Sequence, residues 1–275
     1  MKFSWQWFKK SALLGAAVLV LGGVLAGCGS DSSAVKNEIT VGVTPGSSEQ
    51  IMEYVVEKAK KEGLTVHVKT FSDYITPDQA VATGDIDVNL YQHKPFMDAF
   101  NAKNGTNLVS IGTTYLAPLA VYSHKYKSLN EIPDGGTIAI PNDPTNGSRA
   151  LILLEKQGLI TLDPKKDPLK AVPQDIVENP KHIQIIELEA AQLPRSLEDT
   201  DASVINAGFA ISAGLNSKRD GIAVEGDTSP YVNIVATRAK DKDNPTYKKF
   251  VSIFQSDDVR DFINKEFEGV IIPVW

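Results

Sequence analysis

Residues 137–158 read TIAIPNDPTNGSRALILLEKQG, and this stretch indicates the fold class of the chain. The β-rich run at 137–141 predicts a strand. The apolar residues of 146–157 recur at helical spacing up to Gly158, which favours a helix that ends there. A strand followed directly by a helix is the repeating unit of α/β proteins, in which helices cover the faces of parallel or mixed sheets.

The same alternation continues in both directions from this stretch. We expect strands at 39–43, 64–71, 85–91, 108–113, 119–123, 137–141, 183–188, 203–206, 231–237 and 270–274. We expect helices at 47–61, 77–83, 94–103, 146–157, 193–199, 209–215, 245–255 and 257–267. Either Ser47 or Ser48 is the predicted N-cap of the first helix, because a serine hydroxyl can accept from the free amides of the first turn.

The elements fall into two series, and two helices and a strand remain after the second series. This order predicts an α/β protein with two lobes and a chain that crosses between them twice. We assign 38–118 and 229–275 to lobe 1 and 119–228 to lobe 2. Ligands of open α/β sheets bind at the carboxyl ends of strands, so the cleft between the lobes is the expected site.

The N-terminus has the order of a secretory signal, with lysines at 2, 9 and 10 before an apolar run at 11–27. The residues LAGC at 25–28 resemble the lipobox of bacterial lipoproteins, in which the signal is cut before the cysteine and the thiol carries diacylglycerol. We therefore expect 1–27 to be a signal peptide and 28–37 to be a lipidated, flexible tether.

Two other interpretations of this region are weaker. An uncleaved anchor is disfavoured because the apolar stretch is shorter than the roughly 20 residues that a spanning helix prefers. A buried structural Cys28 is disfavoured because the GSDSS sequence at 29–33 is typical of a solvated linker. Lipidation of Cys28 would hold the protein at the extracytoplasmic face of the cell membrane and leave the mature chain without a free thiol.

Composition and motifs argue against several classes of function. The net charge is −6, and without a stripe of lysine and arginine this makes nucleic-acid binding a poor prediction. The sequence has no phosphate loop, HExxH, GxSxG or paired CxxC motif. The four histidines are dispersed and lack metal-ligand spacing. We therefore expect a protein that is not an enzyme and that has neither a metal nor a cofactor.

Several segments place polar and aromatic residues where strands end, as a binding site would. They are 73–77, 87–96, 141–149, 204–206 and 229–233. In the third of these, Arg149 is predicted to lie in the first turn of a helix. A cation is unfavourable there, against the positive end of the helix dipole, unless an anion meets it.

Four of these sequences together resemble a known family. PNDPTNGSRALILLEKQGLI, DIDVNLYQHKPF, SVINAGFA and SPYVNIV are similar to the methionine-binding lipoproteins of bacterial ABC importers, the NlpA/MetQ-like solute-binding proteins. The resemblance covers about 39–275. It implies a two-lobed, type II-like periplasmic-binding-protein fold with a cleft between the lobes. It also implies capture of L-methionine, or a close analogue, for delivery to an ABC permease with a cytoplasmic ATPase.

The same resemblance implies roles for individual residues. It places the guanidinium of Arg149 on the ligand carboxylate, which a planar arginine can bind with two charge-assisted hydrogen bonds. It places two amides on the ligand's amino and carboxylate groups and three rings around its side chain. These residues are Asn206 and Asn233 for the amides, and Tyr74, Tyr91 and His93 for the rings.

Other roles for these residues stay open at this point. Arg149 could be a surface residue that pairs with Asp143. The tyrosines could be core aromatics with hydroxyls that reach the surface. His93 could cap or bridge backbone, and the two asparagines could satisfy their amides on backbone groups.

The sequence departs from the family pattern at two positions. Tyr91 stands where the family often has phenylalanine, and Phe209 stands where an aromatic residue with a hydroxyl is common. The polarity of the pocket could therefore differ, so a short peptide or another amino acid is an alternative ligand. A surface interaction lipoprotein is an alternative function, and an exported hydrolase is a weaker one because no nucleophile or metal site can be named.

Replacement of Cys28 tests the predicted anchor. Cys28→Ala should release the protein from the cell surface, because stable attachment depends on the acyl chains that the thiol carries. Ligand binding by the isolated domain should be unchanged. Fractionation of cells into membrane and soluble material measures the first effect, and retention of the variant on membranes would contradict the prediction.

Overall fold

The computed structural model describes residues 37–227 and 229–275, which belong to one compact unit, Val35–Trp275. The predicted signal peptide at 1–27, the predicted lipidation site Cys28 and all but the last residue of the predicted tether lie outside the described residues. Within those residues, every helix is too short or too polar to cross a bilayer.

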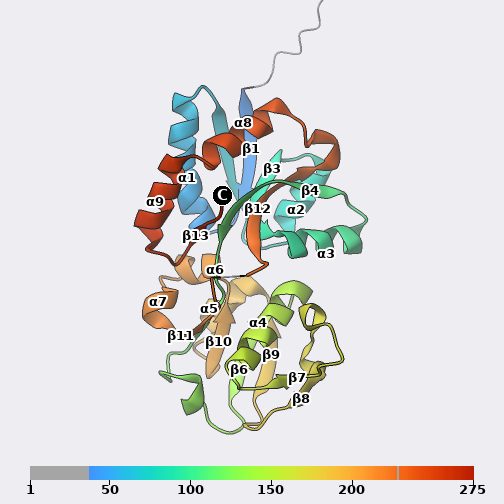
Figure 1. The fold of residues 1–275 in the computed structure, drawn as a ribbon, viewed down its shortest axis with the longest axis vertical. Coiled ribbons are helices and arrows are strands. Elements are labelled where there is room, and N and C mark those ends of the chain that lie inside the picture. Colours follow the sequence, from blue (N-terminus) through green and yellow to red (C-terminus); the bar gives the residue numbers. More distant parts are fainter. Residues whose placement is uncertain (1–36, 228) are drawn as a thin grey trace, which may run out of the picture. The chain divides into compact units, whose positions relative to one another are not determined.

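A six-stranded sheet forms the larger part of this unit (Figure 1), with the order β13-β4-β12-β3-β1-β2. Its strands are β1 (Glu38–Val43), β2 (Thr65–Thr70), β3 (Val88–His93), β4 (Leu108–Leu116), β12 (Val232–Arg238) and β13 (Ile272–Pro273). Strand β1 pairs in parallel with β2 and β3, whereas β12 is antiparallel to β3 and β4. Helices α1 (Ser47–Lys61), α8 (Pro245–Phe254) and α9 (Asp257–Phe267) cover one face, and α2 (Thr76–Thr83) and α3 (Lys94–Asn104) cover the other.

A five-stranded sheet with the order β11-β5-β10-β6-β9 forms the rest. Its strands are β5 (Ala120–Tyr122), β6 (Thr137–Pro141), β9 (Gln184–Leu188), β10 (Ala202–Ile205) and β11 (Gly221–Val224). Helix α4 (Pro144–Lys156) packs on one face, and α5 (Leu193–Ser196) and α6 (Ala207–Ser212) pack on the other. The remaining elements are α7 (Ser217–Asp220), the paired strands β7 (Thr161–Leu162) and β8 (Ile176–Glu178), and 3-10 turns at Leu129–Glu131, Pro168–Lys170, Pro173–Asp175, Ala190–Gln192 and Ala239–Asp241.

We call the six-stranded sheet with its helices lobe 1 and the five-stranded sheet with its helices lobe 2. The chain enters lobe 2 between β4 and β5 and returns to lobe 1 between β11 and β12. These two connections, 117–119 and 225–231, are the crossover segments. They run close together, since the amide of Glu225 donates to the carbonyl oxygen of Leu119 at 2.8 Å.

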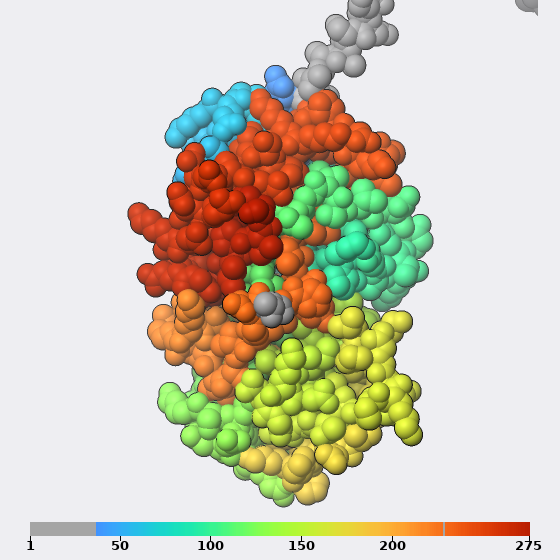
Figure 2. Space-filling model, viewed as in Figure 1, coloured from blue at the N-terminus to red at the C-terminus, as the bar shows by residue number. Residues whose placement is uncertain are grey.

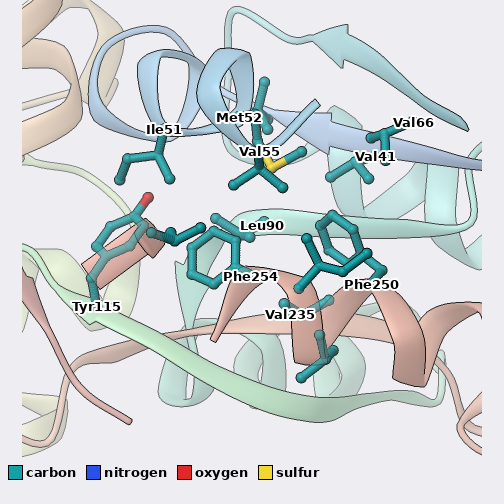
Figure 3. Close-up of a cluster of buried hydrophobic side chains, with 14 of the residues drawn as sticks. Val41, Ile51, Met52, Val55, Val66, Leu90, Tyr115, Val235, Phe250 and Phe254 are labelled. Atoms are coloured by element: carbon teal, nitrogen blue, oxygen red, sulfur yellow. The ribbon is translucent and has the colours of Figure 1, made fainter. Parts of the chain in front are cut away.

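The core of lobe 1 lies between the sheet and the helices α1 and α8 (Figure 3). Val41, Leu90 and Val235 project from three neighbouring strands and meet Phe250 and Phe254, which lie four residues apart on one face of α8. Each of these five side chains is at most 1% exposed. The core brings the two ends of the described chain together, and Figure 2 shows the C-terminal helices packed beside α1.

Local patterns predict several elements well. Helices α1 and α9 and strand β6 have the predicted bounds, because each has a strong period and a clear terminator. The predicted serine cap of α1 is wrong. Gly46 is the N-cap, with a φ of 91°, and makes no side-chain cap. Ser48 instead donates its hydroxyl to the carbonyl oxygen of Thr44 at 2.7 Å.

The start of α4 also differs from the prediction. Asp143 caps this helix by accepting from the amides of Thr145 and Asn146, and the helix begins at Pro144. Arg149 therefore lies in the second turn and not in the first, so the predicted conflict with the helix dipole does not arise at this position. Strands β7, β8 and β11 are too short for their pattern to stand out in the sequence.

Truncation of a core ring tests the packing of lobe 1. Phe254 is fully buried, and its ring lies 6.5 Å from that of Phe250 and 5.6 Å from that of Trp275. Phe254→Ala should lower the free energy of unfolding by about 3–5 kcal/mol, because it removes buried surface and leaves a cavity. Val177→Ala, at a side chain that is 57% exposed, should change it by less than about 0.5 kcal/mol. Equal effects of the two variants in urea unfolding would contradict the assigned core.

Candidate functional site

A cavity lies where the two lobes meet. It encloses about 470 Å³ of space, including its opening to solvent, and residues of both lobes line it. The structure brings all the predicted ligand-binding residues to this one cavity: Tyr74, Tyr91, His93, Arg149, Asn206 and Asn233. Their roles toward a ligand stay predictions.

The ends of strands and the starts of helices position these side chains. Tyr91 and His93 lie at the carboxyl end of β3, and Asn233 lies near the start of the neighbouring antiparallel strand β12. From lobe 2, Asn206 follows β10 and precedes α6, while Arg149 comes from α4. Both lobes thus present polar groups at sheet ends, where α/β proteins bind ligands.

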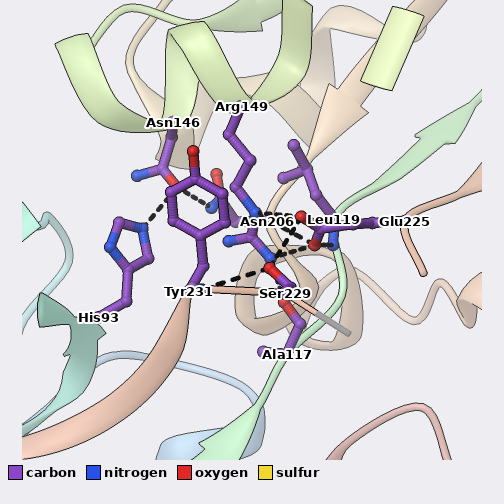
Figure 4. A network of polar contacts seen from close by, with 9 residues as sticks. All are labelled: His93, Ala117, Leu119, Asn146, Arg149, Asn206, Glu225, Ser229 and Tyr231. Carbon is purple, nitrogen blue, oxygen red and sulfur yellow. Dashed lines mark hydrogen bonds and ion pairs between the residues drawn. The ribbon is translucent and has the colours of Figure 1, made fainter. Parts of the chain in front are cut away.

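A hydrogen-bonded network spans the lobes at this point (Figure 4). The Oδ1 atom of Asn146 lies 3.1 Å from His93 Nε2 and accepts from Asn206 Nδ2 at 3.0 Å. His93 Nδ1 accepts from the amide of Phe96 at 3.2 Å, which caps helix α3. Because Nδ1 is an acceptor, Nε2 carries the proton and donates to Asn146. His93 therefore has both the capping role left open above and a place in the cavity wall.

The imidazole of His93 is neutral. It is only 4% exposed, and burial together with the charge of Arg149 lowers its pKa to about 3. A neutral ring donates one hydrogen bond and adds no charge to the cavity.

Arg149 is buried, with 4% exposure, and its guanidinium has several partners. Nε donates to both carboxylate oxygens of Glu225 at 3.1 Å. Nη2 donates to Glu225 and to the carbonyl oxygen of Ala117, the latter at 3.0 Å. The guanidinium carbon lies 4.5 Å from the ring centroid of Tyr231 (Figure 4). The alternative of a surface arginine paired with Asp143 is therefore wrong.

The side-chain amides of the two predicted asparagines have different hydrogen-bond partners. Asn233 Nδ2 donates to the backbone oxygen of Tyr91 at 3.0 Å. Asn206 uses its Nδ2 on Asn146, whereas its Oδ1 is buried and has no partner among the described residues. A buried acceptor without a donor is costly unless a ligand or water satisfies it. The free oxygen of Asn206 is thus available to accept from a cationic group in the cavity.

Aromatic rings form the remaining wall. The Tyr74 ring lies 5.5 Å from Tyr91, 5.9 Å from Phe96 and 4.9 Å from Phe209, measured between centroids. The extra hydroxyl of Tyr91 donates to the backbone oxygen of Tyr74 at 2.5 Å, so its proton is used within the wall. Burial raises the pKa of both tyrosines, which keeps them neutral. The wall thus offers ring faces to an apolar side chain.

Sequence reasoning missed several residues of the site. Asn146 lies in the segment 141–149, at the predicted start of a helix. A polar residue at that position could have been predicted to line the site. Ser47 and Ser48 were interpreted as caps but line the cavity, together with Thr44, Phe96 and Tyr115. Glu225 gave no signal, because it is one acid among many and its partner is 76 residues away.

The backbones of the two lobes touch beside the cavity. Gly46, before α1, has a φ of 91°, and a Cβ placed on it would lie 2.0 Å from the carbonyl oxygen of Gly208 in lobe 2. No side chain fits at so short a distance, so glycine at position 46 permits this approach.

Among residues 37–227 and 229–275, no group of histidine, cysteine or carboxylate side chains is arranged to hold a metal ion. The polar groups of the cavity are instead amides, hydroxyls, one imidazole and one guanidinium. This set suits an organic ligand that carries hydrogen-bond donors and acceptors.

Comparison with known proteins gives consistent matches. A family model described as NlpA lipoprotein matches residues 39–275. The D-methionine-binding lipoprotein MetQ of Salmonella typhi is 48% identical over 273 residues, covering 98% of each chain, and that of Escherichia coli K12 is 46% identical with the same coverage.

Two solved structures match closely. A nutrient-binding protein from Burkholderia cenocepacia bound to methionine has a TM-score of 0.84 at 46% identity, covering 86% of this chain and all of the other. A methionine-binding protein, MetQ, has a TM-score of 0.84 at 47% identity, covering 87% and 98%. The predicted two-lobed α/β fold is confirmed.

The contact at Gly46 can be tested with a matched pair of glycines. Gly46→Ala should weaken binding of a ligand between the lobes roughly tenfold or more, because the added methyl group forces the lobes apart. Methionine, the ligand of the Burkholderia structure, serves as the probe. Gly63 has a similar positive φ of 71°, and a Cβ placed on it would have no atom within 4 Å, so Gly63→Ala should leave the affinity unchanged. Calorimetric titration measures both. Equal affinities of the two variants would contradict the role of this contact.

Proposed function

This chain belongs to the NlpA lipoprotein family, and from that premise we propose that it is a solute-binding protein, not an enzyme, that captures methionine between its lobes. One observation carries the proposal. A buried guanidinium, an unpartnered amide oxygen and an aromatic wall line the same cavity. These groups match the carboxylate, the ammonium and the thioether side chain of methionine in turn.

The carboxylate of the ligand would bind to Arg149. The guanidinium of Arg149 donates to Glu225 and Ala117 through Nε and Nη2, and its Nη1 has no hydrogen-bond partner among the described residues. The same bonds hold the guanidinium plane in one orientation, so little side-chain entropy is lost when a ligand binds. A charge-assisted bond in a desolvated cavity is stronger than a neutral one.

The ammonium group would donate to Asn206 Oδ1, the buried acceptor that lacks a protein partner. Asn233 is the second amide at the cavity and its Oδ1 is a further candidate acceptor. Together with Arg149, these groups would select ligands that carry both an amino and a carboxylate group.

The thioether chain would lie against the rings of Tyr74, Tyr91 and Phe96. A sulfur beside an aromatic ring gains roughly 0.3–1.5 kcal/mol. Burial of a side chain of this size contributes roughly 1.5–3 kcal/mol more. The L-enantiomer stays our prediction, and because the relatives are named for D-methionine, both enantiomers belong in the binding experiment.

Transport completes the proposal. The protein would be held by lipid on Cys28 at the extracytoplasmic face of the cell membrane and would deliver methionine to an ABC permease with a cytoplasmic ATPase. The proposed lobe bounds are 38–118 with 229–275 for lobe 1 and 119–228 for lobe 2. They are supported by the two crossover segments between the sheets.

A short peptide is the second candidate ligand. A further cavity of about 1120 Å³, including its opening, shares Tyr74 and Phe96 with the first and carries Asp73, Asp143 and Glu189. A second residue with a cationic amino terminus could extend into this space. Competition between methionine and a Gly-Met dipeptide separates the two ligands.

Calorimetry with methionine tests the proposed function. The unmutated protein should bind with a Kd tighter than about 100 μM. Arg149→Ala should weaken binding roughly 30-fold or more, because it removes the charged partner of the ligand carboxylate in a desolvated site. Arg219→Ala, at an arginine whose side chain is 67% exposed, should have no effect.

Two results would count against this assignment. Failure of both methionine enantiomers to bind would exclude methionine as the ligand. Unchanged affinity in a folded Arg149→Ala variant would remove Arg149 from the binding site.

A further inference from the structure

Glu225 lies beside the guanidinium of Arg149 (Figure 4) and is not among the residues that line the cavity. Its side chain is 12% exposed. Its carboxylate accepts from Arg149, from the amide of Leu119 at 3.2 Å and from the hydroxyl of Ser229 at 3.1 Å. Glu225 is therefore held in place by both crossover segments and by helix α4 of lobe 2.

Arg149 is the one permanently charged residue among the described residues that line the cavity. The other lining groups are neutral, including His93, whose pKa is held at about 3. Without Glu225, the cavity would present an isolated cation in a desolvated space. Such a cation would attract any carboxylate of suitable size, whether or not it carried an amino group.

Two more carboxyl groups contact amides of the cavity. Asp143 accepts from Asn146, and Asp78 accepts from Gln92. Burial raises the pKa of Asp78 to about 6. Both groups add negative charge near the site, but they bind amides, and Glu225 is the carboxylate that contacts the guanidinium itself.

We propose that Glu225 is a specificity-determining residue that neutralises Arg149 and makes the cavity select zwitterionic amino acids over the corresponding carboxylates without an ammonium group. This inference rests on the proposed function and deepens it. For a zwitterion, repulsion between Glu225 and the ligand carboxylate is offset by attraction to the ammonium. For a desamino carboxylate only the repulsion remains, and the ligand is disfavoured.

A merely structural role for Glu225 makes a different prediction. If the residue served only to hold the crossover segments together, its loss would weaken both kinds of ligand by the same factor. The informative quantity is therefore the ratio of two dissociation constants, for 4-(methylthio)butanoate, which is methionine without its amino group, and for methionine.

The experiment measures this ratio by calorimetry at pH 7 for the mature domain and two variants. The unmutated protein should prefer methionine strongly. Glu225→Gln removes the charge and keeps one of the two oxygens, which can still accept from the amide of Leu119, while its Nε2 can donate to the hydroxyl of Ser229. It should lower the ratio roughly tenfold or more. Glu225→Asp keeps the charge, so its ratio should stay near that of the unmutated protein even if both affinities fall. Asp258→Asn, in an exposed pair with Lys58, serves as the matched control and should change neither affinity.

The outcomes separate the two claims. Equal weakening of both ligands by Glu225→Gln overturns the role of Glu225 and leaves the methionine assignment standing. Absence of methionine binding by the unmutated protein overturns both. If Glu225→Gln does not fold, the unmutated protein still decides, because similar affinities for the two ligands contradict selection for a zwitterion.

Discussion

The buried ion pair between Arg149 and Glu225 is the interaction on which the site depends. It links helix α4 of lobe 2 to both crossover segments, through Glu225 on one and Ala117 on the other. Removal of an arginine from water is costly, and a buried pair offsets that cost only when its geometry is good and its remaining donors are satisfied. Here the carboxylate, a backbone oxygen and the ring of Tyr231 all meet the guanidinium. The cation is thus fixed at the edge of the cavity before any ligand arrives.

The rest of the site follows from where the two sheets end. Strand β3 and the first turn of α3 share His93, which caps the helix with one nitrogen and donates across the lobes with the other. The Oδ1 atom of Asn146 accepts from both His93 Nε2 and Asn206 Nδ2. Groups that stabilise helix and strand ends thus also form the polar wall, and Gly46 lets the lobes come close enough to share it.

Local sequence signals predict the strand–helix alternation and the assignment of elements to two lobes well. Hydrophobic period, helix caps and glycine terminators each act over only a few residues. Helix α1 and strand β6 are examples. The resemblance to a family added the six predicted ligand-binding positions, and all six line one cavity. Local signals failed where one residue changed a boundary, as when Asp143 and Pro144 started α4 earlier than expected and moved Arg149 to the second turn. They could not predict the partner of Arg149, because Glu225 meets it only after the chain has passed through lobe 2 and turned back.

Native mass spectrometry of gently purified mature protein tests the central claim most directly, since it identifies whatever the cavity holds without a choice of probe. We predict a complex heavier than the protein by the mass of one methionine, and loss of that species after denaturation and refolding in ligand-free buffer. A bound species without both an amino group and a carboxylate, displaced by neither enantiomer of methionine, would contradict the account.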